Sequence, residues 1–401
     1  MKKAFWIAVI VAIPALLIIG LQDEPLNARA KAWLADAPTE SRAYDCLLGL
    51  GATPDQDGCA VGAAFRRSNR LLETDPPGGS AAPLMDQPLL CRYREAGCLR
   101  RQQARPAESR ALLSRHAVLR QRYLHILSLD DFAELTPATL EARFPPYSLL
   151  MAGARLQSLA VASGAEDADT LPGEIDRLRD LLARPHNLIS KLTVVAMLEE
   201  KSRLAALLVQ SGRMPNPMPA PLGQDERNMD EAFKAEFRLM ANLFLRQLQR
   251  DNEPVGLYER LWLRAGLRPR MTVNRLTPLY RHYMTQATLP PEARSSTPFS
   301  LPAPGIRSRL TNPVGNRLVA IQGPDFMPYI ARLDVLDARL RLFHWLAGAS
   351  NPPTNPWRSR AATPRRAATE LCFDAPPTDG DRRPCLPLLS SARPTPTTPA
   401  D

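Results

Sequence analysis

The sequence of 401 residues contains none of the short motifs by which many enzyme families are known. It has no glycine-rich loop ending in Gly-Lys-Ser/Thr, no His-Glu-x-x-His, no Gly-x-Ser-x-Gly and no Cys-x-x-Cys. Close doublets of cysteine and histidine with the spacing of zinc ligands are also missing. We therefore predict no cofactor and no metal, and we lean towards a protein without catalytic activity.

Lysine is scarce although the chain is basic, with only six lysines among 51 basic residues and a formal net charge of +10. The arginines are scattered through predicted helices, often beside acidic residues, instead of gathering with aromatic residues on one strip as nucleic-acid binding would require. We therefore predict no nucleic-acid partner. A generally basic surface is the simplest interpretation, and attraction to an anionic envelope polymer is the alternative.

Charged residues are absent from Ala4 to Leu21, an apolar run of eighteen residues. At about 1.5 Å per helical residue the run would span roughly 27 Å, close to the ~30 Å hydrocarbon core of a bilayer. Lys2 and Lys3 precede it, so the positive-inside rule keeps the N-terminus in the cytoplasm. We predict a signal anchor over residues 1–22 that spans the inner membrane once and leaves the body in the periplasm. A cleaved signal peptide and a buried soluble helix are the alternatives.

The six cysteines lie in three couples of near neighbours, as the structural disulfides of an exported domain would. Six cysteines allow about fifteen pairings, so the connectivity within couples is a hypothesis. In a continuous helix two residues seven apart lie roughly 10 Å from each other, beyond the ~7 Å limit for a disulfide. A bond between Cys91 and Cys98 therefore requires a break, for which Gly97 is the candidate. The predicted couples are Cys46 with Cys59, Cys91 with Cys98, and Cys372 with Cys385.

Apolar residues recur at helical spacing through most of the chain, and few segments alternate with the period of a strand. The predicted fold class is all-α: the transmembrane helix is followed by a multi-helix bundle or orthogonal helical array over residues 23–350. The segment NPVGNRLVAIQG is the exception, because it reads as a turn followed by a short strand. Helices are expected at about 26–36, 40–50, 61–73, 106–126, 148–163, 171–184, 187–211, 225–250, 256–265, 272–286 and 328–346.

Proline is abundant, with forty residues, and it is concentrated in loops and at the C-terminal end. Residues 351–401 are rich in proline, threonine and arginine and too poor in apolar side chains to fold alone. We predict a largely disordered tail, which could also lie over the body. Cys372 and Cys385 could close off part of it.

Three residues are weak candidates for catalysis. The segment NLISKLTVVAMLEEKSRLAALLVQSG is apolar on opposite faces, which predicts a central buried helix. On it, Glu199 and Arg203 form an i,i+4 pair that could either supply a carboxylate for acid–base chemistry or only fix the packing. Glu236 lies at the edge of an apolar stripe on the next long helix and could join Glu199 if the two helices pack. His282, in LYRHYMTQ, is the histidine most worth testing.

Two stretches resemble a known family: YDCLLGLGATPDQDGCAVG at 44–62 and NPVGNRLVAIQGPDFMPYIARLDVLDARLRL at 312–342. The family consists of proteobacterial envelope proteins that have one N-terminal anchor and a helical body of similar size, with no assigned activity. The resemblance implies the same topology for most of residues 1–346. It leaves out the proline-rich tail and carries over no functional residue.

Two hypotheses of different class follow. The first is a membrane-anchored periplasmic scaffold that binds or assembles envelope components, with another envelope protein as its expected partner. The second is an envelope hydrolase that cleaves glycan with Glu199 or Glu236. Two exposed carboxylates in a groove, roughly 5–10 Å apart, would favour the hydrolase. Contact between Glu199 and Arg203 in a closed core would favour the scaffold.

Overall fold

The computed structural model describes residues 22–79, 81–215, 220–247, 266–294, 299–321, 325–349, 351–358, 360–375 and 383–389. The predicted anchor over Ala4–Leu21 and the helix expected at 256–265 lie outside these residues. In the part of the chain that is described, no helix is both long and apolar enough to cross a membrane.

The described chain is mostly helical, as predicted. Its helices are α2 (Ala28–Ala35), α3 (Arg42–Leu48), α4 (Gly58–Arg67), α5 (Ala82–Met85), α6 (Cys98–Ala104), α7 (Pro106–Arg115), α8 (Ala117–Leu127), α9 (Tyr147–Ser163), α10 (Thr170–Leu182), α11 (Leu188–Gln210), α12 (Gln224–Arg227), α13 (Asp230–Asn242), α15 (Pro269–Thr288), α16 (Ile306–Thr311), α17 (Pro313–Ile321) and α18 (Met327–Leu346). Short turns of 3-10 or π helix add η1 (Arg70–Leu72), η2 (Pro88–Leu90), η3 (Leu243–Gln247) and η4 (Pro291–Ala293).

Four predicted elements differ from the observed ones. The described part of the helix expected at 225–250 is divided into α12, α13 and η3, because the chain is extended at Asn228, and the helix expected at 61–73 ends at Arg67. The helix expected at 106–126 is broken at His116, which separates α7 from α8 and lets both helices pack on α9. The segment predicted as a turn and short strand is instead the helix α17, so that prediction is wrong. Its buried residues Gly315 and Val319 are four apart, as on one face of a helix, and α17 packs on α15.

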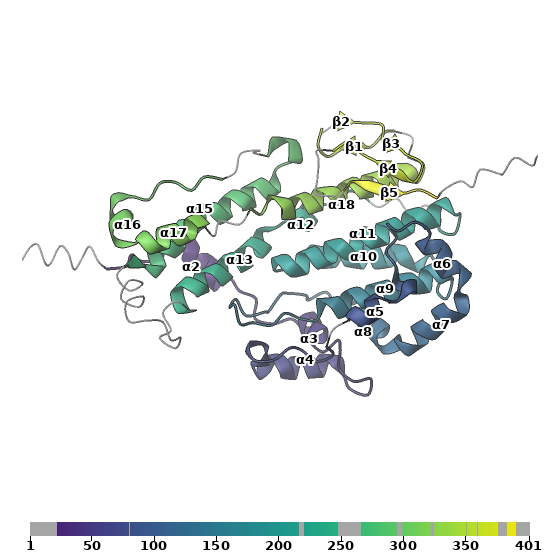
Figure 1. The fold of residues 1–401 in the computed structure, drawn as a ribbon, viewed down its shortest axis with the longest axis horizontal. Helices are drawn as coiled ribbons and strands as arrows, with labels where there is room; N and C mark the ends of the chain where they lie inside the picture. The colour runs from purple at the N-terminus through teal and green to yellow at the C-terminus, as the bar shows by residue number, and fades with distance from the viewer. Residues whose placement is uncertain are drawn as a thin grey trace, which may run out of the picture.

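Helix α11 is the centre of the body, which confirms the central buried helix expected from its apolar faces. It begins at a capping box in which Asn187 and Ser190 satisfy each other's backbone N–H groups. It contacts α9, α10, α13, α18 and the C-terminal strand β5 (Cys385–Pro387). Figure 1 shows α10, α11 and α18 running side by side along the long axis of the molecule.

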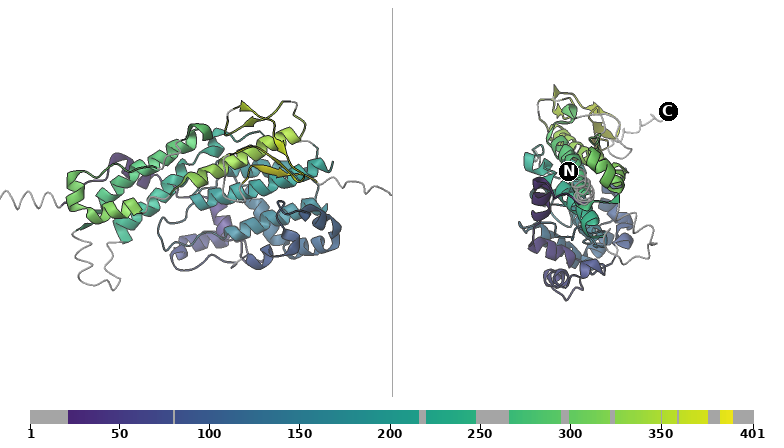
Figure 2. Two further views of the ribbon diagram at one scale, coloured as in Figure 1. Left: turned by 45° about the horizontal axis from the view of Figure 1, so that its top comes forward. Right: turned by 90° about the vertical axis from the view of Figure 1, so that its left-hand side faces the viewer.

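The molecule is elongated, and its two ends are built from different parts of the chain (Figures 1 and 2). The helices α2, α13, α15, α16 and α17 form one end, where the described chain begins. The helices α6 and α7 and the C-terminal strands form the other end.

The C-terminal segment is folded against the body. Strand β1 (Thr354–Asn355) pairs with β2 (Arg360–Ala361), and a second antiparallel sheet has the order β3 (Arg365–Arg366), β4 (Glu370–Cys372), β5. Strand β5 packs on α11 and α18. The prediction of a largely disordered tail is therefore wrong for residues 351–358, 360–375 and 383–389.

The physical reason lies in contacts that are distant along the sequence. The guanidinium of Arg339, on α18, is 1% exposed and donates to the carbonyl oxygens of Cys385 (3.3 Å) and Arg383 (2.9 Å). The amide of Gln210, at the end of α11, donates to Pro387 (3.0 Å) and accepts from the N–H of Leu389 (3.0 Å). These bonds supply the stability that the composition of the segment lacks.

All six cysteines form disulfides, and the pairing within each couple is confirmed. The Cys91–Cys98 bond joins Cα atoms 5.8 Å apart. Gly97 has a φ of 79°, which a side chain would disfavour, and helix α6 starts only after it. The break predicted at Gly97 is thus present, and it allows this bond. In β4 and β5, Cys372 lies directly opposite Cys385.

Candidate functional site

A cavity of about 370 Å³ opens where the loop at 91–94 meets α9, α11 and α18. The Cys91–Cys98 disulfide holds this loop against the start of α6, and the backbone N–H of Tyr93 donates to Glu200 of α11 at 3.0 Å. The loop is therefore held by the disulfide at Cys91 and by the hydrogen bond at Tyr93. A volume of this size lies within the usual range for a small-molecule site.

The walls of the cavity carry an excess of positive charge. Five arginines and Lys201 line it, against two glutamates, Glu199 and Glu200. Burial lowers the pKa of the half-buried Arg155, and the positive charge of Arg92 lowers it further. An anion in the cavity would relieve both effects. The five arginines are Arg92, Arg94, Arg155, Arg203 and Arg332.

One wall of the same cavity is apolar. Helix α11 presents apolar side chains one turn apart, and α9 adds Met151 opposite them. The cavity thus joins an apolar surface to a cationic rim, which suits a ligand with an anionic group and an apolar part. The apolar residues of α11 that line it are Leu192, Val195, Ala196 and Met197.

Glu199 lies in this cavity as a counterion. Its Oε1 is 2.5 Å from Nη1 of the buried Arg339, and its Oε2 is 3.8 Å from Nη2 of Arg203. Arg203 also lies 2.5 Å from Oε1 of Glu200. Glu199 therefore contacts Arg203, as the scaffold hypothesis expects, and a second arginine that the sequence gave no reason to suspect. Its side chain is 21% exposed, so the surround is not fully closed.

A second cavity, of about 590 Å³, shares Tyr93, Arg94 and Arg203 with the first. It lies between α6, α11 and the C-terminal strands, and it is also lined by Arg339 and Arg383. The two cavities are neighbours across a common wall. The folded C-terminal segment therefore contributes to the cationic surroundings of the site.

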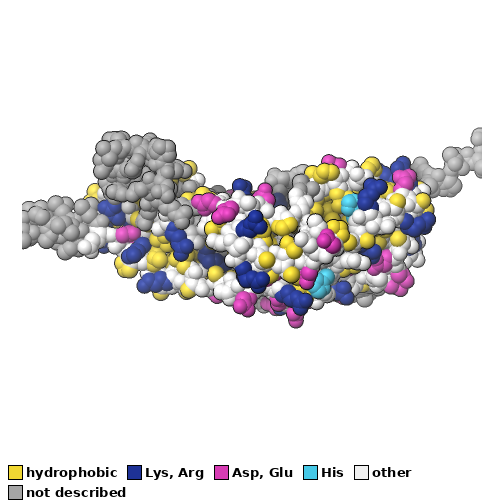
Figure 3. Space-filling model, turned by 90° about the horizontal axis from the view of Figure 1, so that it is seen from below, with side chains coloured by type: hydrophobic (Ala, Val, Ile, Leu, Met, Phe, Trp, Pro, Cys, Tyr) yellow, Lys and Arg dark blue, Asp and Glu magenta, His cyan; other side chains and the backbone are white. Residues whose placement is uncertain are grey.

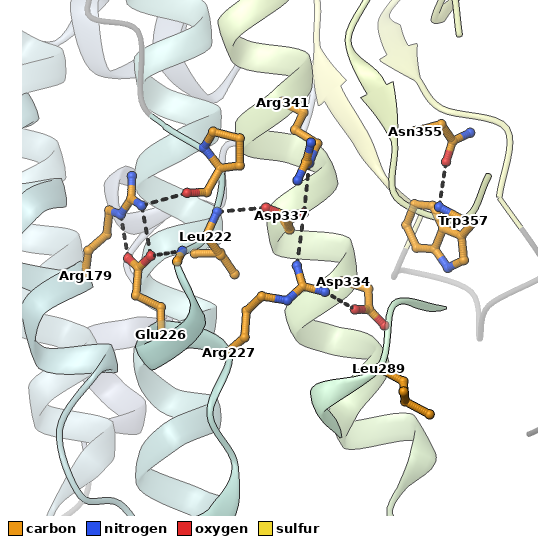
Figure 4. A network of polar contacts seen from close by, with 12 residues as sticks. Arg179, Leu222, Glu226, Arg227, Leu289, Asp334, Asp337, Arg341, Asn355 and Trp357 are labelled. Atoms are coloured by element: carbon orange, nitrogen blue, oxygen red, sulfur yellow. Dashed lines mark hydrogen bonds and ion pairs between the residues drawn. The ribbon is translucent and has the colours of Figure 1, made fainter. Parts of the chain in front are cut away.

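Helix α18, which carries Arg332 and Arg339, is fixed by a network of ion pairs. Figure 4 shows Arg227, just before α13, between two carboxylates of α18: its Nη2 lies 2.9 Å from Asp334 and its Nη1 3.0 Å from Asp337. Asp337 also accepts from the N–H of Leu222 at 2.8 Å. The network ties the segment before α13 to α18 and so fixes one wall of the cavity.

The sequence candidates Glu199 and Glu236 are not brought together. Glu236 lines a different cavity, of about 380 Å³, between α13 and the segment at 134–139. It is half-buried, and burial raises its pKa to about 6. The same cavity is lined by Glu134, whose carboxylate accepts from the hydroxyl groups of Thr136 (2.5 Å) and Tyr147. Burial also raises the pKa of Glu134.

His282 lies on α15, in a fourth cavity at the surface. Its ring stacks on Phe299, with ring centroids 4.6 Å apart, and meets Tyr283 edge to face at 5.3 Å. Burial lowers its pKa. The ring therefore packs the loop that contains Phe299 against α15, and it shares no cavity with Glu199 or Glu236.

Metal-ligand groupings occur at two places among the described residues. Cys46 and Cys59 lie near His125, and Cys372 and Cys385 lie near Glu370. Each grouping contains a disulfide, which leaves no thiolate to bind an ion.

The face of the molecule seen in Figure 3 shows how its surface charges are distributed. Basic and acidic side chains are interspersed over this face, with hydrophobic side chains between them. On the described part of this face the two signs of charge are therefore mixed.

The sequence did not predict the cationic cavity, although Glu199, which lines it, was a candidate site residue. Its arginines come from a loop and from three helices, and only the fold brings them together. The signal that could have found it is the doublet Arg92 and Arg94 beside a disulfide, which fixes two exposed arginines near the core. Glu134 was missed as well, because its short segment has no periodic pattern.

No protein family, curated protein or solved structure matches this chain. The resemblance of 44–62 and 312–342 to envelope proteins thus stays a prediction.

Proposed function

We propose that the protein is a membrane-anchored binding or assembly component of the bacterial envelope, whose body in the periplasm holds an anionic, partly apolar ligand in the arginine-lined cavity. The observation that carries the proposal is the combination of five arginines with the apolar wall of α11 in one cavity of about 370 Å³. The ligand is a segment of an envelope protein or polymer that carries phosphate or carboxylate groups.

Three disulfides support the periplasmic location, because such bonds persist in oxidising compartments. The uncharged run Ala4–Leu21 supports a single-pass inner-membrane anchor with a cytoplasmic N-terminus. Alkaline phosphatase fused to the C-terminus tests this topology, because the enzyme is active only outside the cytoplasm. An inactive fusion would refute it.

Binding is tested with the full chain in phosphatidylcholine nanodiscs, using hexyl phosphate, inorganic phosphate and hexanol as probes in calorimetry. Hexyl phosphate should bind tightest, and binding should weaken as salt rises. The variant Arg92→Gln/Arg155→Gln should lose about tenfold in affinity, which corresponds to the loss of charge-assisted bonds. Arg110→Gln, an exposed arginine of α7 outside the cavity, is the matched control and should change nothing. Equal binding by both variants would refute the site.

The alternative, an envelope hydrolase, is favoured by one observation. Burial raises the pKa of Glu236 to about 6, within the range of a general acid, and Glu134 lines the same cavity. Such an enzyme would use Glu236 with Glu134 and would leave Glu199 out. Release of reducing sugar from peptidoglycan by the wild type but not by Glu236→Gln would support the hydrolase, and absence of release would count against it.

A further inference from the structure

The three most exposed large apolar side chains of the described chain all lie within sixteen residues. They are Ile306 (78%), Leu310 (76%) and Ile321 (69%), on α16 and α17. Ile306 and Leu310 are four residues apart, so they lie on the same side of α16. Scattered exposed apolar residues are normal, but a group at one end of a molecule usually marks a contact surface.

The same two helices are basic. From Phe299 to Ile321 there are three arginines, Arg307, Arg309 and Arg317, and no acidic residue. All three side chains are exposed. In Figure 3 several basic side chains are visible at this end of the molecule. Apolar side chains beside arginines form the composition that binds the interface of an anionic bilayer.

The described chain begins at the same place. The guanidinium of Arg307 donates to the carbonyl oxygen of Gln22 at 2.8 Å. The carboxylate of Asp23 accepts from the N–H groups of Arg270 (2.7 Å) and Met271 (3.1 Å), which fixes residue 23 to the first turn of α15. The uncharged run Ala4–Leu21 therefore joins the body directly beside α16.

The surface is also rigidly supported. The side chain of the buried Asn312, between α16 and α17, accepts from the N–H of Arg268 at 2.8 Å and donates to Thr272 of α15 at 3.0 Å. Ser308 of α16 and Asn316 of α17 are joined by two hydrogen bonds, of 2.9 and 2.8 Å. The two helices are thus held in one orientation on α15.

We infer that α16 and α17 dock on the surface of an anionic phospholipid bilayer, with Ile306, Leu310 and Ile321 inserted at the interface and the arginines at the headgroups. This inference rests on the proposed anchor. The docking places the long axis of the body away from the membrane, so that the C-terminal strands lie at the far end (Figure 1). The arginine cavity is then presented along the side of an upright body.

The test places one nitroxide on the full chain in liposomes. All six native cysteines are in disulfides, so a single introduced cysteine is labelled selectively. Ile306→Cys and Leu310→Cys report on the surface, and Ala361→Cys, on exposed β2 at the other end, is the control. In vesicles with phosphatidylglycerol, collisions with oxygen relative to an aqueous nickel reagent should be about threefold higher at 306 and 310 than at 361. The excess should shrink in pure phosphatidylcholine.

The failures are distinguishable. If the protein does not float with vesicles, the anchor is refuted and the docking with it. If it floats but the labels at 306 and 310 are as accessible to nickel as the label at 361, only the docking is refuted. Spin–spin broadening between labels at 310 would place a second copy of the chain on this surface and would also overturn the docking.

Discussion

Replacing Lys201 with methionine tests how strongly one buried ion pair in the wall of the arginine cavity stabilises the body. Lys201, on α11, is 1% exposed, and its ammonium lies 2.7 Å from Oε1 of Glu174 on α10. The ammonium also donates to the carbonyl oxygen of Ala154 at 2.8 Å. Methionine would remove the ammonium and leave the Glu174 carboxylate in the core. The carboxylate would keep its hydrogen bond from the hydroxyl of Tyr123, at 2.6 Å.

Removing one partner of a buried ion pair usually lowers the free energy of unfolding by about 3–5 kcal/mol, because the remaining charge stays desolvated. With a urea m-value of about 3 kcal/mol/M, the unfolding midpoint should fall by roughly 1 M. The double variant Lys201→Met/Glu174→Gln removes the stranded charge and should recover about 2 kcal/mol. Lys234→Met is the matched control, because Lys234 pairs with Asp36 and Glu231 near the surface and should contribute about 1 kcal/mol or less.

The assay is urea unfolding followed by far-ultraviolet circular dichroism, with the disulfides intact. The order of midpoints should be wild type, Lys234→Met, the double variant and then Lys201→Met. The reasoning is refuted if Lys201→Met is no less stable than Lys234→Met. It is refuted as well if the double variant is less stable than Lys201→Met alone.

Three further perturbations have defined outcomes. Burial lowers the pKa of Lys191 from 10.5 to about 8, so between pH 8 and pH 10.5 the unfolded chain binds more protons than the folded one. The urea midpoint of the wild type should therefore rise with pH over this range, and that of Lys191→Met should depend less on pH. A methyl group at Gly62 would lie 1.8 Å from a backbone oxygen of α3, so Gly62→Ala should lower the melting temperature by several degrees, whereas Gly173→Ala, with nothing within 4 Å, should not lower it. Cys372→Ser/Cys385→Ser removes a crosslink that stabilises by about 3 kcal/mol in the chain-entropy model, so trypsin should cleave the C-terminal strands faster while the helical body resists.

The disulfides and most helices could be predicted because they depend on neighbours in the sequence. Cysteines seven or thirteen residues apart need only a local turn, and Gly97 supplies one. The burial of α11 could be predicted from the spacing of its own apolar residues, without knowing which helices pack on it. The C-terminal segment could not be predicted in the same way, because its order depends on Arg339, which lies 46 residues before the carbonyl it binds in Cys385.

The candidate site was predicted only in its acidic part. Glu199 was recognised because an acidic residue in an apolar helix is conspicuous. Arginines on a loop are not conspicuous in a chain with so many of them. Arg92 and Arg155 line one cavity because the segments on either side of the loop, η2 and α6, pack on α9. The strand predicted at α17 was wrong for a related reason, since the buried side of this short helix faces α15 and its sequence alone does not show that partner.

The position of Glu199 bears on the choice between binding and catalysis. A general acid must donate a proton to the substrate, whereas the carboxylate of Glu199 lies 2.5 Å from one guanidinium and 3.8 Å from another, so its two oxygens are engaged as counterions. Its effect is to orient Arg203 and Arg339 in the walls of two neighbouring cavities. Replacing it with glutamine would free positive charge at this wall, so anion binding should strengthen. A hydrolase built on Glu236 and Glu134 would not use Glu199, so Glu199→Gln should leave its turnover unchanged. Weaker binding of hexyl phosphate by Glu199→Gln than by the wild type would refute the counterion role.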